Sequence, residues 1–204
     1  MDPREDILLL DVDGVLVTPP EFFGVRLLRE HPEAARAFFF GPFVEASTGR
    51  SDLLTHLPAF LKELGRPQTP QAFLREWLES ENHPNPGLWA AVEELRAAGW
   101  RVHLATNQEA HRTRHLLDEV GLGQLVEGHF ASSAVGHRKP VPDYFAEVTR
   151  RLGVPPAHLV FWDDSHENVA AAQAAGWRAF RYEDVPTFRR VMGLPVADPA
   201  LTRG

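Results

Sequence analysis

Cysteine is absent from this chain of 204 residues, which excludes disulfides, zinc–thiolate sites and thiol-based catalysis. Long apolar runs are absent too, since no stretch approaches the ~20 residues that a membrane-spanning helix requires. Basic residues are outnumbered, with 21 Lys and Arg against 28 Asp and Glu, and they form no long block. We therefore expect a partner that is neither a nucleic acid nor a membrane.

The first residues lack the basic segment and apolar stretch of a secretory signal peptide, so we expect a cytoplasmic protein. The hydrophobic fraction of 44% and the charged fraction of 24% are ordinary for a globular protein. A chain of this length can form one large domain, or a core domain with a small insertion. Nothing in the sequence indicates an oligomeric state.

What the chain does have is an apolar strand that ends in two acids. Residues 7–17 read ILLLDVDGVLV, and Ile7–Leu10 is typical of a strand buried on both faces of a parallel sheet. Asp11 and Asp13 follow at once. Carboxylates at the end of a buried strand are costly unless they are paired, metal-bound or used chemically. The alternative interpretation is an ordinary Asp-Gly turn.

Later in the chain, helices and strands alternate. Further strands are predicted at 101–105, 129–131, 158–162 and 177–181, and the helices between them at 110–120, 143–152 and 167–175. This order indicates an α/β fold with a Rossmann-like parallel sheet flanked by helices. In such sheets ligands bind at the carboxyl ends of the strands.

Between the first and second strands the pattern is helical only. This segment holds most of the 13 phenylalanines, which we interpret as packing for a small separate core rather than as a cofactor site. The predicted division is therefore a catalytic core of residues 1–18 and 83–204, with an all-helical cap of residues 19–82.

Polar side chains gather at the predicted strand ends and in one connection. They are Thr106, Asn107, Lys139, Asp163 and Asp164, in addition to Asp11 and Asp13. Carboxylates crowded at one edge would repel by roughly 4 kcal/mol per close pair at an effective dielectric near 20. A lysine and a divalent cation would relieve this repulsion. Oxygen ligands without cysteine favour Mg²⁺.

Each of these groups also has an ordinary interpretation. Thr106 and Asn107 would cap the following helix, Lys139 would be a solvated surface lysine, and 163–165 would be a capped turn. Separately these interpretations are reasonable. Jointly they require that all the groups reach the same edge of the sheet by coincidence.

The ordered set of motifs resembles the haloacid dehalogenase-like hydrolase superfamily. The motifs are Asp11-Val12-Asp13-Gly14-Val15, Thr106-Asn107, Lys139-Pro140 and Asp163-Asp164-Ser165. The likeness is to the branch of phosphatases and β-phosphoglucomutase that has a helical cap between the first and second motifs. It implies Mg²⁺-dependent hydrolysis of a small phosphorylated metabolite, such as a sugar phosphate, through an aspartyl-phosphate.

The resemblance also implies a role for each residue. Asp11 would be the nucleophile that attacks phosphorus, and Asp13 the acid that protonates the leaving oxygen and later the base that activates water. Thr106 and the backbone N–H of Asn107 would hold the phosphoryl oxygens. Lys139 would neutralise Asp11 and the transferring group.

The implied Mg²⁺ ligands are Asp11, the backbone carbonyl of Asp13, and Asp164, with support from Asp163 directly or through water.

Three alternatives remain beside the phosphatase. A haloacid dehalogenase does not fit Asp13, because a departing halide needs no proton. A phosphosugar mutase is suggested by Ser47–Asp52, which resembles the cap loop that supplies a substrate-binding arginine and makes Arg50 a candidate. Phe23 stands where the mutase has a histidine and weakens that alternative. A non-catalytic protein that binds a phospho-ligand would use the same fold, although intact Asp11 and Asp13 speak against it.

Overall fold

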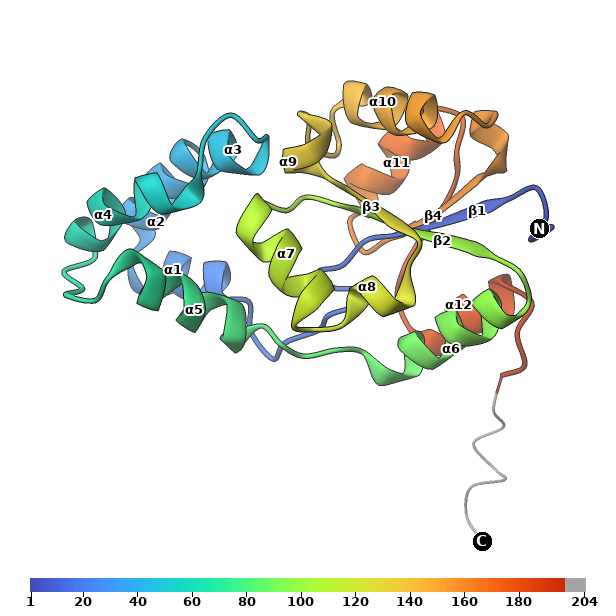
Figure 1. Ribbon diagram of the computed structural model, residues 1–204, viewed down its shortest axis with the longest axis horizontal. Coiled ribbons are helices and arrows are strands. Elements are labelled where there is room, and N and C mark those ends of the chain that lie inside the picture. Colours follow the sequence, from blue (N-terminus) through green and yellow to red (C-terminus); the bar gives the residue numbers. More distant parts are fainter. Residues whose placement is uncertain (197–204) are drawn as a thin grey trace, which may run out of the picture.

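A five-stranded parallel sheet organises the larger part of the chain in the computed structural model, which describes residues 1–196 (Figure 1). The strands are β1 (Ile7–Leu10), β2 (Arg101–Thr106), β3 (Gly128–Ala131), β4 (Leu159–Asp163) and β5 (Arg178–Arg181). Their order is β3-β2-β1-β4-β5, so the first strand is central. The predicted Rossmann-like fold is confirmed. Residues 197–204 of the predicted core lie outside the described residues.

The central strand β1 is buried on both faces, as its sequence predicted. Leu8 and Leu10 pack into one apolar core, and Ile7 and Leu9 into the other, because successive side chains of a strand point to opposite faces. The first core is covered by α6 (Pro86–Ala97), α7 (Ala110–Asp118), α8 (Leu122–Leu125) and α12 (Val185–Val191). The second is covered by α9 (Ser132–Val135), α10 (Pro142–Leu152) and α11 (His166–Ala174), which lie above the strands in Figure 1.

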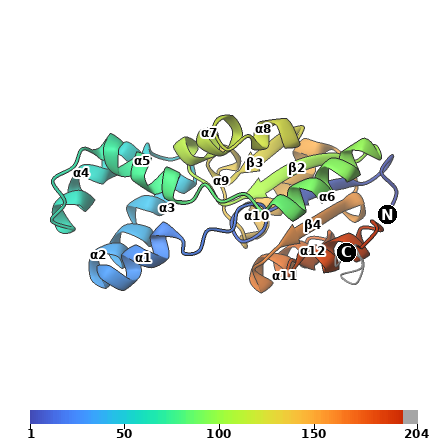
Figure 2. The ribbon, with the colours of Figure 1, turned by 90° about the horizontal axis from the view of Figure 1, so that it is seen from below.

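The helical insertion stands apart from the sheet (Figure 2). Its helices are α1 (Phe23–Glu30), α2 (Pro32–Phe39), α3 (Pro42–Ser47), α4 (Leu53–Glu63) and α5 (Pro70–Ser80). They share an apolar core of their own, in which Phe23, Phe38, Phe60 and Phe73 are buried. The packing role predicted for the phenylalanines is therefore confirmed at these positions. Within residues 1–196, no helix combines the length and apolarity that crossing a membrane requires.

The two chain crossings between core and cap lie side by side. The N–H of Thr18 donates to the carbonyl of His83 at 2.8 Å, and the N–H of Asn85 donates to Leu16 at 2.9 Å. Entry and exit are thus hydrogen-bonded to each other.

A second contact holds the cap on the core at the loop after α3. Ser132 Oγ, at the start of α9, donates to the carbonyl of Ser47 at 2.5 Å. Gly49 has a φ of +74°, and a methyl group there would lie 2.1 Å from the carbonyl oxygen of Ser133. Glycine is therefore required by both the backbone angle and the close approach. The loop seats the cap over the carboxyl edge of the sheet.

Candidate active site

Lys139 is the centre of a buried charge cluster at the carboxyl edge of the sheet. Its ammonium lies 3.0 Å from Asp11 Oδ1 and 2.5 Å from Asp163 Oδ2. It also donates to the carbonyl of Ala105 at 2.7 Å. The lysine and aspartates that the sequence placed in three separate motifs are thus brought together around one cation.

Asp163 is bonded on both of its oxygens. Asn168 Nδ2 lies 3.0 Å from each oxygen, and the N–H of Ser165 donates to Oδ1 at 2.8 Å. Ser165 in turn caps helix α11, so the capped-turn interpretation is correct for this residue. Because Asp163 is fully buried and fully bonded, it orients Lys139 toward Asp11.

The cluster carries an excess of negative charge. Burial raises the pKa of Asp11 to about 7, although Lys139 acts in the opposite direction. Burial also raises the pKa of Asp164, and the neighbouring Asp163 adds to that effect. For Lys139, burial lowers the pKa, but the two adjacent carboxylates outweigh it and the net shift is upward. A further cation would offset the remaining negative charge.

The carboxylates are spaced to hold a metal ion. Asp11, Asp163 and Asp164 each offer an oxygen, and these oxygens lie within 4.8 Å of one another. Asp164 is exposed to solvent, so it is accessible to an ion. Gly14 has a φ of +78°, and a methyl group there would lie 2.3 Å from Asp164 Oδ2. The all-oxygen donor set fits a hard cation such as Mg²⁺.

The predicted phosphate-binding pair lies beside this cluster. Thr106 ends β2 and is almost fully buried. The Asn107 side chain is bonded twice to the backbone of Lys139: its Nδ2 donates to the Lys139 carbonyl at 2.9 Å, and its Oδ1 accepts from the Lys139 N–H at 2.8 Å. That side chain therefore positions Lys139. The phosphate contact predicted for Asn107 would be made by its backbone N–H.

The interpretation of Thr106 and Asn107 as helix caps is wrong. Helix α7 is capped by Glu109, whose carboxylate accepts from the N–H groups of His111 and Arg112. This acid complements the positive end of the helix.

Asp13 is held by two donors from the segment after β2. Gln108 Nε2 donates to Asp13 Oδ2 at 2.7 Å, and Arg112 Nη2 donates to Asp13 Oδ1 at 2.7 Å. Each carboxylate oxygen still has a second lone pair with which to bind a proton. The side chain of Asp13 is 37% exposed, so it is fixed and yet open to a ligand.

Arg112 also links the core to the cap. Its second terminal nitrogen pairs with Glu81, which follows the last cap helix. Glu81 in turn accepts from the N–H of Phe23 at 2.7 Å and from the indole of Trp77 at 3.2 Å. Burial raises the pKa of Glu81, while Arg112 opposes this. One buried guanidinium therefore bridges Asp13 and a carboxylate that joins the first and last cap helices.

These groups face a cavity of about 390 Å³ between cap and core. Its core side is formed by Asp11, Asp13, Thr106, Asn107, Gln108, Arg112 and Asp164. The volume is within the range of small-molecule sites. The candidate nucleophile, the candidate acid, the candidate phosphate-binding pair and the exposed metal ligand Asp164 therefore all line the same cavity.

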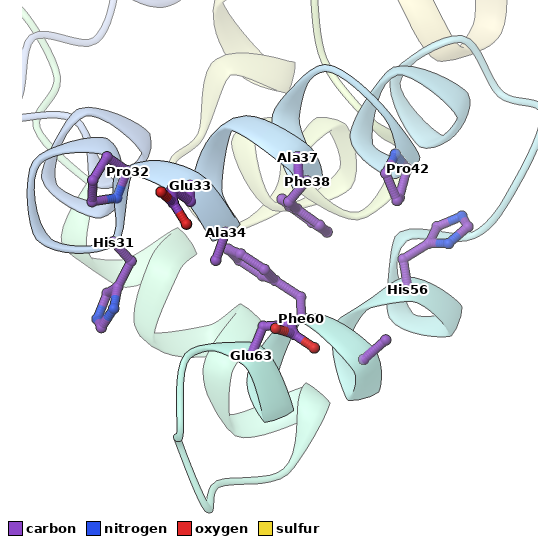
Figure 3. Close-up of a pocket in the computed structure, with 11 residues that line it drawn as sticks. His31, Pro32, Glu33, Ala34, Ala37, Phe38, Pro42, His56, Phe60 and Glu63 are labelled. Atoms are coloured by element: carbon purple, nitrogen blue, oxygen red, sulfur yellow. The ribbon is translucent and has the colours of Figure 1, made fainter.

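A larger cavity of about 690 Å³ is confined to the cap (Figure 3). It lies among α2, α3 and α4, with Phe38 and Phe60 on its apolar wall and His31, His56 and Glu63 around it. It shares no residue with the motifs, so we place the chemistry in the smaller cavity.

The comparison with known proteins agrees with this geometry. Residues 5–176 match the haloacid dehalogenase-like hydrolases. The chain belongs to this family.

Individual relatives of the family differ in how much of the chain they match. The sesquiterpene phosphatase AstK of Aspergillus oryzae is 33% identical over 93 residues, which are 46% of this chain and 47% of that protein. Flavin mononucleotide hydrolase 1 of Arabidopsis thaliana is 26% identical over 208 residues, covering 96% of this chain and 80% of the relative. The chain thus spans about half the length of the first of these curated relatives.

A solved structure shows the same fold. A HAD family enzyme of Bacteroides thetaiotaomicron, in complex with magnesium and inorganic phosphate, superimposes with a TM-score of 0.74 at 20% identity. The match covers 88% of this chain and 94% of that one.

Of the predicted site residues, Lys139 and Asp163 lie buried behind Asp11, whereas Arg50 neither lines the cavity nor contacts the cluster. Its guanidinium pairs with Glu45 at 2.8 Å on the surface of the cap, and both side chains are about half exposed. Its predicted contact with a substrate stays a prediction that this geometry does not support.

Three residues of this haloacid dehalogenase-like site were missed from the sequence. Arg112 lies on helix α7, but Gln108 precedes the N-cap Glu109, so helical spacing could not have paired them, and the only available signal was their position just after the Thr106-Asn107 motif. Glu81 carried no signal, because it is an acid at the end of a surface-like helix and its partner lies on another domain.

Replacing Arg112 with methionine removes both its bond to Asp13 and its ion pair with Glu81. We expect turnover to fall by about 100-fold, because Asp13 loses the donor that fixes it. We also expect unfolding to become easier by about 3–5 kcal/mol, since Glu81 is left buried without a cation. Steady-state kinetics and denaturant unfolding measure the two effects.

Two further variants control this experiment. Adding Glu81→Gln to the Arg112→Met chain should recover much of the stability and little of the rate. Arg114→Met, on the exposed side of the same helix, should change neither. Unchanged turnover in Arg112→Met would show that Asp13 needs no such donor.

Proposed function

We propose that this chain is a Mg²⁺-dependent phosphomonoester hydrolase that works through an aspartyl-phosphate on Asp11. The observation that carries the proposal is that two carboxylates line one cavity and that each is held by different partners. Asp11 is bonded to buried Lys139, whereas Asp13 is bonded to Arg112 and Gln108. Phosphoryl transfer requires this kind of positioning and charge neutralisation more than it requires covalent chemistry from other groups.

The residues divide the reaction into two steps. In the first, a carboxylate oxygen of Asp11 forms a bond to phosphorus, the bond to the ester oxygen breaks, and Asp13 gives that oxygen its proton. In the second, Asp13 takes a proton from a water molecule that attacks phosphorus. The bond between phosphorus and Asp11 then breaks, which releases phosphate, restores the carboxylate of Asp11 and leaves Asp13 protonated for the next cycle.

The other residues bind and neutralise. Lys139 offsets the charge of Asp11 and of the phosphoryl group, while Thr106 and the N–H of Asn107 hold phosphoryl oxygens. Asp11, Asp164 and the backbone carbonyl of Asp13 would hold Mg²⁺, and Asp163 supports them through Lys139. When bound, the ion supplies positive charge to the phosphoryl oxygens.

The relatives support the same chemistry. The names of two of them are those of a phosphatase and of a hydrolase of a mononucleotide, and a protein of the same fold binds magnesium and phosphate. The mutase alternative was suggested by the loop Ser47–Asp52, whose Arg50 pairs with Glu45 and does not line the cavity. We therefore propose hydrolysis rather than transfer within a sugar.

Release of p-nitrophenol from p-nitrophenyl phosphate tests the proposal. We expect turnover with Mg²⁺, its loss on chelation of the metal by EDTA, and its return when Mg²⁺ is added in excess. The absence of turnover with Mg²⁺, Mn²⁺ and Co²⁺ across the pH range in which the protein stays folded would refute an enzymatic role.

A further inference from the structure

The geometry points to a substrate whose alcohol part is apolar and uncharged, a specificity that rests on the proposed phosphatase function. The cavity has two unlike sides. The core side is polar and holds the phosphoryl-handling groups. The cap side, which would meet the alcohol part, is formed mainly by Phe22, Val25, Leu28, Phe39, Phe43 and Trp77.

The aromatic rings of this wall pack against one another and have no free polar group to offer. The rings of Phe43 and Trp77 stack with centroids 5.7 Å apart, and Phe39 meets Trp77 edge-on at 5.8 Å. The indole N–H of Trp77 is already bonded to Glu81. A sugar would therefore lose water from its hydroxyls and find no cap side chain in this wall with which to replace it.

The charges around the cavity disfavour a second anionic group on the substrate. Among the described residues that line it, Arg112 is the single cationic side chain. Its two terminal nitrogens are already paired, one with Asp13 and the other with Glu81. Arg50 lies outside the lining and is paired with Glu45. A carboxylate or second phosphate on the substrate would therefore be desolvated without a partner, close to Asp13 and Glu81.

The wall is also partly open to water in the free protein. Val25 is 54% exposed, and Phe22 and Leu28 are half-buried. An apolar group in the cavity would remove this surface from water, which favours binding. The same surface offers no hydrogen bond or opposite charge to a hydroxylated or charged group of equal size.

Matched primary phosphomonoesters test the inference. Cyclohexylmethyl phosphate and glucose 6-phosphate present a six-membered ring and a primary leaving oxygen, but only the second carries hydroxyls. Phosphoglycolate adds a carboxylate, and p-nitrophenyl phosphate reports activity as such. We expect kcat/KM for cyclohexylmethyl phosphate to exceed those for glucose 6-phosphate and phosphoglycolate by at least about tenfold, chiefly through KM.

A variant pair tests whether the wall causes the preference. Val25→Arg places a cation on the wall. It should raise by about tenfold the ratio of kcat/KM for phosphoglycolate to kcat/KM for cyclohexylmethyl phosphate. Phe40→Arg makes a comparable change at a residue that is 81% exposed and outside the lining, so the ratio should stay unchanged.

The outcomes separate this inference from the proposed function. If p-nitrophenyl phosphate is hydrolysed and glucose 6-phosphate or phosphoglycolate is used as well as cyclohexylmethyl phosphate, the inference is overturned and the phosphatase stands. If none of the esters is hydrolysed, the proposed function fails, and the inference fails with it.

Discussion

Asp11→Asn is expected to abolish hydrolysis, with a loss of roughly 10⁴-fold or more in kcat, because an amide cannot replace the carboxylate that we propose attacks phosphorus. Asparagine has nearly the same shape, so the cavity should be unchanged. Brief reaction followed by an acid quench should leave one phosphoryl group on the peptide that contains residue 11 in the wild type. That group should be missing in the variant.

The stability of the Asp11→Asn variant distinguishes lost chemistry from lost folding. The folded-state pKa of Asp11 is raised to about 7, mainly by burial. The pKa of this carboxyl is higher in the folded state than the ordinary aspartate value of about 4. The group therefore contributes stability below about pH 4, and that contribution is lost as the pH rises from about 4 to about 7. Asparagine cannot ionise, so at pH 7 and above the variant should be as stable as the wild type or more so.

A second aspartate provides the matched control. Asp143→Asn alters an aspartate in the first turn of α10 whose side chain is 71% exposed, so it should leave turnover unchanged and lower the stability by no more than about 1 kcal/mol. Full activity in Asp11→Asn would contradict the covalent mechanism even though the fold and family are as described.

Lys139→Met is expected to have the second largest effect, because it harms both the chemistry and the fold. Lys139 lowers the pKa of Asp11 against the effect of burial. Without this cation Asp11 should keep its proton at neutral pH, and a protonated carboxyl is a poor nucleophile. We expect turnover at pH 7 to fall by at least about 10³-fold, and the free energy of unfolding by about 3–5 kcal/mol because Asp163 stays buried without its partner.

The chain offers one matched control, since its other lysine is Lys62, which lies exposed on cap helix α4. Lys62→Met should change neither turnover nor the denaturant midpoint. Combining Lys139→Met with Asp163→Asn removes one buried carboxylate and should return part of the lost stability without returning activity. A Lys139→Met enzyme with wild-type kinetics would exclude this lysine from the reaction.

The central strand and the motif order could be predicted because they depend on short-range pattern. Ile7–Leu10 is apolar throughout, and both of its faces are buried. Since parallel strands end at one edge, the polar residues that follow them had to meet, and Asp11 does meet Lys139 at 3.0 Å.

The parts that could not be predicted depend on how distant segments pack. Arg50 was a candidate because its loop resembles a substrate loop, but that loop is used to seat the cap against Ser132, and Arg50 pairs locally with Glu45. Glu109 is a less common helix cap than threonine or asparagine, so local preference pointed to the wrong residues. The partners of Arg112 come from the first motif and from the end of the cap.

The bridge through Arg112 connects the cap to Asp13, the proposed acid. Swinging the cap away would separate Arg112 from Glu81, and the same guanidinium orients Asp13. We therefore expect a ligand that favours the closed cap also to favour the position of Arg112 seen here, and by reciprocity a group that fixes Arg112 in this position should favour closure by the same free energy. Asp13, the proposed acid, keeps its bonds to Gln108 and Arg112 when the cap opens, but Arg112 then loses the second partner that fixes it.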